Sequence, residues 1–286
     1  MRWQSLWPSF WPVESRVEKI VSRLAPTPNG ELHFGNLFNF ILTWSHVRNH
    51  GGKLWLRFDD IDQSRCEQRY IDQTKKFLEY IGLDWDDEFS KQYNCLSEYK
   101  FALSRLPQYQ CDCSRKQIQE RASSHFYDGF CKNRNLACTT GEYAIRFQNS
   151  KLEQEDFILW RKEAIPAYHL TSVVDDLRLG VNVIIRGEDL LDSSLAQNEI
   201  YRLLKDSNSS PWKIYHHQLI LSDKGEKLSK SRNDGELFKL MLENISPRVI
   251  MGELAKRLGQ NESKFQSVDD FLALRIEDFS TELQLN

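Results

Sequence analysis

Apolar runs of two lengths alternate along the first third of the chain. The short runs predict strands, and each is followed by a longer segment with apolar residues at helical spacing. The predicted elements are, in order, a strand at 19–24, a helix at 37–48, a strand at 53–58 and a helix at 65–81. Gly51-Gly52 ends the first helix and Gly82 ends the second. Because strand–helix–strand–helix units form parallel sheets with crossover helices, the pattern predicts an α/β fold with a doubly wound parallel sheet.

Beyond residue 100 this rhythm is interrupted. Cysteines and polar turns occupy 101–150, as they would in an insertion. The alternation resumes with 167–174 and 181–186, and apolar spacing predicts a further helix at 195–204. The candidate N-caps of that helix are Asp192, Ser193 and Ser194.

The two ends of the chain differ in character. Residues 1–19 form a tryptophan-rich arm, in which Pro8 and Pro12 break the apolar stretch, so the start of the chain does not read as a signal peptide. The C-terminal part is predicted to be helical. Ser246-Pro247 supplies a cap and a first-turn proline, and Gly259 closes that helix.

Composition narrows the class of protein. The chain has 286 residues, of which 40% are hydrophobic, yet it has no apolar run of the ~18 residues that a membrane helix needs. Six cysteines without an export signal indicate a reducing compartment, where thiols more often bind metal than pair. We therefore expect a cytoplasmic protein without a membrane partner. Its net charge is −3, but 202–232 forms a basic stripe suited to phosphate or RNA.

A first candidate site lies between the first predicted strand and its helix, in the segment Arg23–Asn36. Ligands of doubly wound sheets bind at the carboxyl ends of the strands, where a helix N-terminus offers N–H groups to phosphate. His33 can donate a hydrogen bond to a phosphate oxygen, and Gly35 lets a flat ring approach the backbone. A second candidate lies in the basic stripe, where Lys227 and Lys230 flank small residues and can close over a polyphosphate.

Together the two motifs resemble those of class I aminoacyl-tRNA synthetases. His33-Phe-Gly-Asn36 stands at the position of the HIGH motif, and Lys227-Leu-Ser-Lys-Ser231 at that of KMSKS. Segments that further resemble glutamyl-type enzymes are Arg23-Leu-Ala-Pro-Thr-Pro, Arg57-Phe-Asp-Asp-Ile-Asp, Gly82-Leu-Asp-Trp-Asp, Tyr168-His-Leu, Val173-Val-Asp-Asp and Arg186-Gly-Glu-Asp-Leu-Leu.

The resemblance implies a role for each matching residue. His33 and Lys230 are the expected catalytic residues. The residues expected to bind ATP, with Mg²⁺, are His33, Gly35, Asn36, Lys227 and Lys230. The residues expected to line the amino-acid pocket are Arg23, Ala25, Thr27, Asp59, Tyr168 and Arg186. Guanidinium groups suit a substrate carboxylate, and a carboxylate suits its ammonium group.

Asp59 departs from the family, which has glutamate at this position. The aspartate is one methylene shorter, so its reach toward the substrate amino group is shorter by roughly one carbon–carbon bond. Weaker binding, a bridging water or a different amino acid are the possible consequences. An ordinary acidic surface turn would fit Asp60 and Asp62 better than Asp59.

A third constellation lies in the predicted insertion, where Cys111-Asp-Cys113 is followed by Cys131. Thiolates bind zinc tetrahedrally, so these residues predict one Zn²⁺ site. Its fourth ligand is left open among Tyr127, His125, Cys138 and water. The resemblance to the short glutamyl-queuosine tRNA(Asp) synthetases, which use a tyrosine before the last cysteine, implies Tyr127. Cys66 and Cys95 are expected to be structural.

That resemblance, which extends from about residue 21 to the C-terminus, also implies a function. The expected reaction is ATP-dependent activation of glutamate to an aminoacyl-adenylate, followed by transfer to queuosine in the anticodon of tRNA(Asp). ATP, glutamate and tRNA would be the partners of a monomer. Two alternatives remain: a truncated glutamyl-tRNA synthetase paralogue that charges a tRNA 3′ end, and a non-catalytic, zinc-stabilised RNA-binding module.

The expected domain organisation follows from the same motifs. Only 56 residues follow Lys230, too few for the anticodon-binding region of a full glutamyl-tRNA synthetase. The expected parts are an arm at 1–19, the first half of the nucleotide-binding catalytic domain at 20–100, the zinc-binding insertion at 101–150, the second half with the KLSKS loop at 151–240, and a short helical tail at 241–286.

Overall fold

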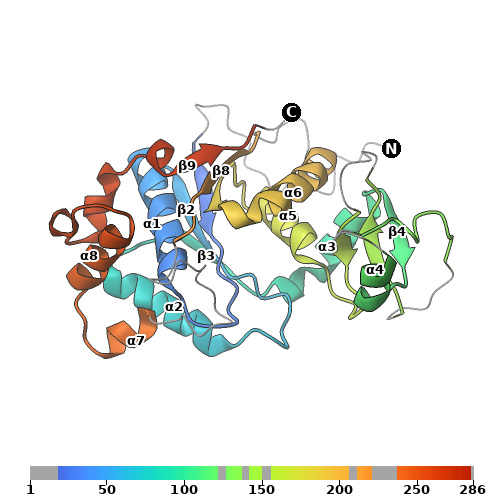
Figure 1. Ribbon diagram of the computed structural model, residues 1–286, viewed down its shortest axis with the longest axis horizontal. Coiled ribbons are helices and arrows are strands. Elements are labelled where there is room, and N and C mark those ends of the chain that lie inside the picture. The colour runs from blue at the N-terminus through green and yellow to red at the C-terminus, as the bar shows by residue number, and fades with distance from the viewer. Residues whose placement is uncertain are drawn as a thin grey trace. The chain divides into compact units, whose positions relative to one another are not determined.

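The computed structural model describes residues 19–121, 127–136, 142–149, 156–205, 211–220 and 237–284 (Figure 1). The tryptophan-rich arm and the loop that carries Lys227 and Lys230 lie outside these ranges. The chain divides into two compact units. The first unit is drawn from Met1–Lys91, Arg178–Asp192 and Ser209–Asn286, and the second from Gln92–Leu177 and Ser193–Asn208.

The first unit is built on parallel strands. The neighbours β1 (Val21–Leu24), β2 (Lys53–Arg57) and β3 (Asp87–Phe89) are parallel, as are β7 (Val183–Gly187) and β8 (Lys213–His217). Hydrogen bonds join β1 to β7, because the Ser22 hydroxyl donates to the Val183 carbonyl at 2.7 Å and the Asn182 N–H to the Val21 carbonyl at 3.0 Å. The order β3-β2-β1-β7-β8 is therefore that of a doubly wound sheet, with its topological switch point between β1 and β7.

The helices of this unit bury their apolar residues against the sheet and against each other. Helix α1 (Phe34–Asn49) packs on β1, β2 and β7, and its other side is covered by the 3₁₀ helix η6 (Val268–Ala273). The Ser45 hydroxyl on α1 donates to the Phe271 carbonyl of η6 at 2.9 Å. The amphipathic α2 (Gln68–Ile81) packs against α7 (Leu237–Leu242). Burial on both sides explains why α1 is apolar around most of its circumference.

The C-terminal part of the chain is helical, as predicted, and adds one strand that was not predicted. Helix α8 (Pro247–Arg257) begins after Ser246 with proline in its first turn, and Gly259 follows it with a φ of +67°. The 3₁₀ helices η5 (Glu262–Lys264) and η7 (Ile276–Asp278) come after it. The strand β9 (Ser280–Glu282) then pairs antiparallel with β8 and covers its edge.

The second unit contains an antiparallel sheet of β4 (Gln108–Cys111), β5 (Ala144–Phe147) and β6 (Ile158–Trp160). Its helices are α3 (Leu96–Ser104), after the 3₁₀ helix η2 (Gln92–Cys95), then α4 (Arg115–Arg121), α5 (Tyr168–Arg178) and most of α6 (Leu191–Leu204). The fully buried Asp175 of α5 accepts hydrogen bonds from the Tyr99 hydroxyl at 2.9 Å and from Gln92 Nε2 at 2.7 Å. These bonds fix α5 to the start of the unit.

One sequence prediction in this region is wrong. The predicted caps of the helix at 195–204 lie inside α6, which begins at Leu191, directly after the 3₁₀ helix η3 (Glu188–Leu190). The helical turn of η3 leads into α6, so no side-chain cap is needed at residues 192–194. None of the described helices is long and apolar enough to cross a membrane.

Candidate active site and metal centre

The His33 motif forms the first turn of α1, directly after the loop that follows β1. His33 is the N-cap residue: its Nδ1 accepts the Asn36 backbone N–H at 3.3 Å, and the Asn36 side-chain oxygen accepts the His33 N–H at 3.1 Å. The first and last residues of the motif therefore make a reciprocal capping box. This box fixes the ring of His33 at the helix N-terminus, where the backbone dipoles favour an anion.

Gly35 has a further role that the sequence did not reveal. A Cβ at this position would lie 3.0 Å from both Cε1 and Nδ1 of the His33 ring. Such a contact is tighter than ordinary van der Waals spacing, so with a side chain at residue 35 the ring would have to shift by a few tenths of an ångström. Glycine at this position leaves the His33 ring its place in the cap.

The residues expected at the amino-acid pocket include several at strand ends of the first unit. Arg23 lies near the end of β1 and Arg186 near the end of β7, and both side chains are buried. Ala25 is half-buried and Thr27 exposed in the loop that leads from β1 to α1. Two buried guanidinium groups thus flank the switch point of the sheet, where anionic substrates bind in this fold class.

Asp59 forms a buried ion pair that the sequence did not predict. Its Oδ1 lies 2.7 Å from Nε of Arg57, and the two side chains are 8% and 0% exposed. A second contact of 3.4 Å joins Arg57 Nη2 to Oδ2, so the guanidinium faces both carboxylate oxygens. Asp60 is also buried and accepts the Lys91 N–H at 2.8 Å, so the alternative of an acidic surface turn does not fit Asp60 either. A charged residue inside the apolar strand pattern was the available signal for Arg57.

A cavity of about 580 Å³ lies at the carboxyl end of β8. Its walls include Phe38 of α1, Glu188 after β7, Gln218 after β8 and the segment 277–281. His216, also in the wall, lies opposite Arg186 in the strand register, and burial followed by the positive charge of Arg186 lowers its pKa to about 4. The volume suits a small-molecule ligand. The sequence analysis missed Glu188 and Gln218, although residues directly after parallel strands were the available signal.

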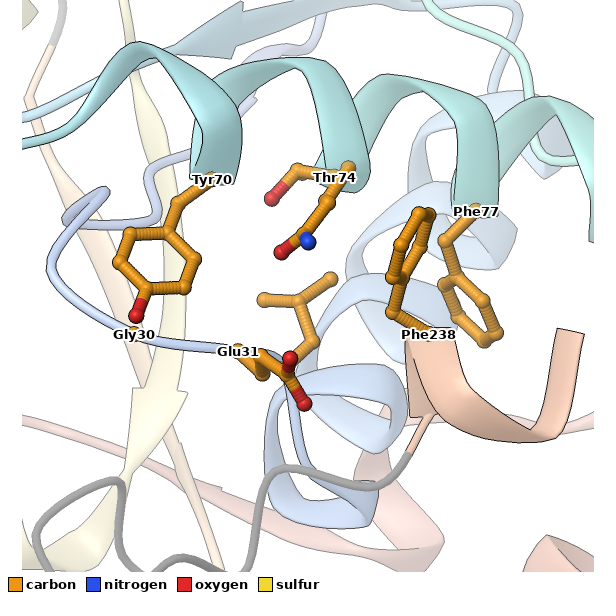
Figure 2. A pocket seen from close by; sticks show the side chains of 8 residues that line it. Gly30, Glu31, Tyr70, Thr74, Phe77 and Phe238 are labelled. Carbon is orange, nitrogen blue, oxygen red and sulfur yellow. The ribbon is translucent and has the colours of Figure 1, made fainter. Parts of the chain in front are cut away.

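Figure 2 shows a much smaller pocket, of about 10 Å³, in the same unit. Tyr70, Thr74 and Phe77 of α2 face the loop at Gly30–Glu31, and Phe238 of α7 closes one end (Figure 2). Space of this size admits about one water molecule, so this pocket is not a substrate site.

Three predicted site residues lie outside the described part of the first unit. Tyr168 belongs to the second unit, where it begins α5 and is 39% exposed. Lys227 and Lys230 lie outside the described residues. Their roles stay predictions.

The second unit brings the three predicted cysteine ligands together. The sulfur atoms of Cys111, Cys113 and Cys131 all lie within 4.8 Å of one another, and those of Cys113 and Cys131 are 3.4 Å apart. The Tyr127 hydroxyl lies 3.4 Å from the Cys111 sulfur and accepts the Cys131 backbone N–H at 2.8 Å. Of the other candidates for a fourth ligand, His125 and Cys138 lie outside the described residues.

The surroundings of the cysteines differ in their electrostatics. Burial acts to raise the pKa of the Cys111 thiol, but its interaction with Tyr127 and the positive charge of Arg146 outweigh burial, so the pKa lies below its usual value. Burial and the Cys131 thiol raise the pKa of Cys113 to about 11. Cys95 is buried and Cys66 half-buried, and neither belongs to this cluster.

Comparison with known proteins places these features in a family context. The family model described as tRNA synthetases class I (E and Q), catalytic domain, matches residues 19–135 and 138–272. A glutamyl-Q tRNA(Asp) synthetase from Yersinia pseudotuberculosis is 33% identical over 89% of this chain and 80% of its own length. The enzyme of that name from Deinococcus radiodurans is 31% identical over 84% and 89% of the two chains.

A further relative and a solved structure agree with these matches. The glutamyl-Q tRNA(Asp) synthetase of Idiomarina loihiensis is 36% identical over 74% of this chain and 80% of its own length. The crystal structure of glutamate-tRNA synthetase from Elizabethkingia anophelis superimposes with a TM-score of 0.72 over 92% of this chain and 67% of that chain. Its sequence identity is 20%, so this likeness concerns the fold.

Proposed function

This chain belongs to the class I tRNA synthetases of the glutamate and glutamine type, and we propose that it glutamylates queuosine in the anticodon of tRNA(Asp). The observation that carries the proposal is that relatives named for this reaction match most of the chain. The matched region includes the capped His33 motif and the buried arginines at the strand ends. We propose the cytoplasm as the place of the reaction, since both ATP and tRNA are present there.

In the proposed first step, an oxygen of the glutamate α-carboxylate attacks the α-phosphorus of ATP. The bond to the bridging oxygen breaks, pyrophosphate leaves, and glutamyl-adenylate remains. In-line transfer of this kind needs positioning and electrostatic stabilisation rather than a covalent protein group. Mg²⁺ bound with ATP would neutralise phosphate charge.

The proposed donors to the phosphates are His33 and Lys230, with Lys227 beside it on the same loop. Because Nδ1 of His33 accepts the Asn36 N–H, the proton of the neutral ring is carried by Nε2. Nε2 is therefore the atom that would donate to a phosphate oxygen. The N-terminus of α1, with Gly35 in its first turn, adds backbone N–H groups.

We assign the nucleoside part of ATP to the cavity at the carboxyl end of β8. The cavity opens beside Ile220, after which the loop with the two motif lysines begins. Phe38 provides an apolar wall, and the Glu188 carboxylate provides an acceptor suited to ribose hydroxyls.

The amino-acid pocket is proposed to use the buried guanidinium groups of Arg23 and Arg186 for substrate carboxylate and Asp59 for the substrate ammonium group. The ion pair with Arg57 holds the Asp59 carboxylate in one orientation. Ala25 and Thr27 of the same unit complete the proposed pocket, and the role of Tyr168 in the second unit stays a prediction. In the second step the oxygen of a queuosine hydroxyl attacks the activated carbonyl carbon, the bond from this carbon to the phosphate oxygen breaks, and AMP leaves with the hydroxyl proton on its phosphate.

The donor set in the second unit fits a structural zinc ion. Sulfurs 2.3 Å from one tetrahedral zinc ion are about 3.8 Å apart, and the observed cluster, within 4.8 Å, is close to this spacing. We propose Cys111, Cys113, Cys131 and Tyr127 as the four ligands. When bound, zinc would cross-link the end of β4 to the segment 127–131.

The experiment that tests the function measures ATP-dependent transfer of labelled glutamate to total tRNA from cells with and without queuosine. We expect label only on tRNA that contains queuosine. Label on both tRNA samples would indicate charging at the 3′ end and contradict the proposal. Absence of label on both would contradict glutamate transfer altogether. Loss of transfer in the Lys230→Ala and His33→Ala variants would tie the activity to this chain.

A further inference from the structure

We propose that Arg121 and Arg134 form an outer shell of the metal centre in which each guanidinium group stabilises a different cysteine sulfur, and that Arg146 supports the Tyr127 ligand by stacking on its ring. The inference deepens the zinc site of the proposed function and rests on it. All of the residues involved belong to the second unit.

Arg121 and Arg134 each contact one sulfur atom. Arg121 Nη2 donates to Cys113 Sγ at 3.2 Å, and Arg134 Nη1 to Cys131 Sγ at 3.5 Å. The guanidinium carbon of Arg146, on β5, lies 3.6 Å from the centre of the Tyr127 ring. Two sulfur atoms thus receive a guanidinium hydrogen bond each, one from α4 and one from the loop after Cys131, and the third arginine contacts the proposed tyrosine ligand.

Further contacts hold these guanidinium groups in place. Asp128 accepts from Arg121 at 2.7 Å, and Asp112 accepts from Arg134 at 2.9 Å. The buried Arg146 donates to the Asp156 carbonyl at 2.8 Å.

The exposed position of Phe130 is explained by its contacts with Arg121 and Arg134. Its ring is 50% exposed, which is unusual for a large apolar side chain beside a cysteine cluster. The guanidinium carbon of Arg121 lies 4.2 Å from the centre of this ring, and that of Arg134 lies 4.9 Å from it. Guanidinium groups stack favourably on aromatic rings. Phe130 therefore acts as a clamp that positions both arginines over the sulfurs.

The net charge of the zinc-bound site explains why guanidinium groups would contact its sulfur atoms. Three thiolates and one zinc ion carry a net negative charge, which is costly in a buried site without compensation. Guanidinium groups hydrogen-bonded to the sulfurs offset that charge and fix the orientation of the ligands. Partners outside the ligand shell typically change metal affinity by about 10- to 100-fold when they are removed.

The competing interpretation is that Arg121 and Arg134 form ordinary surface ion pairs with Asp128 and Asp112. Exposed pairs of that kind have little effect on the rest of a protein. Lys116 and Glu120 make such a pair on α4, with a separation of 3.9 Å and no sulfur contact among the described interactions. The two interpretations differ in whether removal of the arginines changes metal retention.

The test measures how fast zinc leaves the full-length, zinc-loaded protein for a coloured chelator under reducing conditions. For the double variant Arg121→Gln/Arg134→Gln we expect release at least about 10-fold faster than from the wild type. Phe130→Ala should accelerate release by a smaller factor, and Lys116→Gln is the matched control with unchanged release. Circular dichroism of each loaded variant checks that its fold is intact.

The possible outcomes separate this inference from the proposed function. Unchanged release from the folded double variant would overturn the outer shell while leaving the zinc site intact. A wild-type protein that binds no zinc would overturn both the zinc site and the outer shell. A zinc-loaded wild type that fails to glutamylate tRNA would contradict the proposed reaction only, because zinc release is measured without substrate.

Discussion

Arg57 and Asp59 form a buried ion pair. The Asp59 carboxylate, which is proposed to bind the substrate ammonium group, is therefore already paired with a guanidinium group of the protein. The buried charged side chains at the ends of β1, β2 and β7 are Arg23, Arg57, Arg186, Asp59 and Asp60. Three guanidinium groups against two carboxylates leave a net positive charge. Glutamate carries a net negative charge at neutral pH, so the balance favours it as substrate. Asp59 is thus compatible with glutamate in spite of its shorter side chain.

Replacement of Gly35 by alanine should slow the reaction while leaving the stability of the protein almost unchanged. In the Gly35→Ala variant the new Cβ would lie 3.0 Å from the His33 ring, so the ring must move. We expect transfer of labelled glutamate to slow by about 10- to 100-fold, as for a misplaced catalytic group. The free energy of unfolding, measured in urea, should change by less than about 1 kcal/mol, because alanine is intrinsically favoured over glycine in a helix.

Gly252 provides the control for this prediction. It lies within α8, where a Cβ would meet Glu262 Cβ at an ordinary 3.7 Å. Gly252→Ala should therefore keep wild-type transfer. Equal activity of the two variants would show that the position of the His33 ring does not matter for the reaction.

At the scale of the elements, helix α1 shows where prediction from sequence succeeds and where it stops. Its buried apolar positions predicted a helix, but the start was placed at residue 37 instead of Phe34. The missed turn is capped by a histidine and an asparagine, and histidine is not a usual N-cap residue. The same geometry links fold and function, because the cap residue is the proposed catalytic one.

The strand at the edge of the sheet, β9, could not be predicted from its own sequence. The segment 280–282 reads Ser-Thr-Glu, which is too short and too polar to predict a strand. It forms β9 only because β8 offers an unpaired edge, a contact between residues about 65 positions apart in the chain. Glu188 and Gln218 could have been found from the strand-end rule, whereas Phe279 and its neighbours could not.

Phe279 should therefore affect the binding of ATP. Its ring lies 5.8 Å from that of Phe38 and lines the cavity assigned to the nucleoside. For Phe279→Ala we expect the KM for ATP to rise about 5- to 10-fold, equivalent to roughly 1 kcal/mol of lost contact, with little change in kcat. Transfer rates at varied ATP test this. Leu242→Ala, at a site that is 64% exposed on α7, is the control. An unchanged KM in Phe279→Ala would place the nucleoside elsewhere.

At the scale of the whole molecule, local chemistry was easier to predict than its supporting contacts. The three cysteine ligands were predicted because short spacings bring thiols together whatever the fold does. Arg121 and Arg134 could not be, since their role depends on the turn that aims them at the sulfurs. The pocket arginines of separate strands, Arg23 and Arg186, were predicted through the resemblance, and their burial depends on the sheet order.

Two histidines, the half-buried His46 and the buried His216, should make the first unit sensitive to mild acid. Burial, followed by the charge of His50, lowers the pKa of His46 to about 4, and His216 shows a similar pKa. Both values lie below the unfolded value of about 6.5, so the unfolded chain binds the additional protons. The stability from the neutral histidines is complete above pH 6.5 and is lost progressively toward pH 4. Taken at full value, each lowered pKa would reduce the free energy of unfolding by about 2 kcal/mol between pH 7 and 5. Solvent screening at these partly exposed rings reduces this contribution, and we expect a fall of about 2 kcal/mol in total. Urea titrations at several pH values test this. The His46→Gln variant should lose about half of the pH dependence, and a wild-type stability that stays constant from pH 7 to 5 would contradict the prediction.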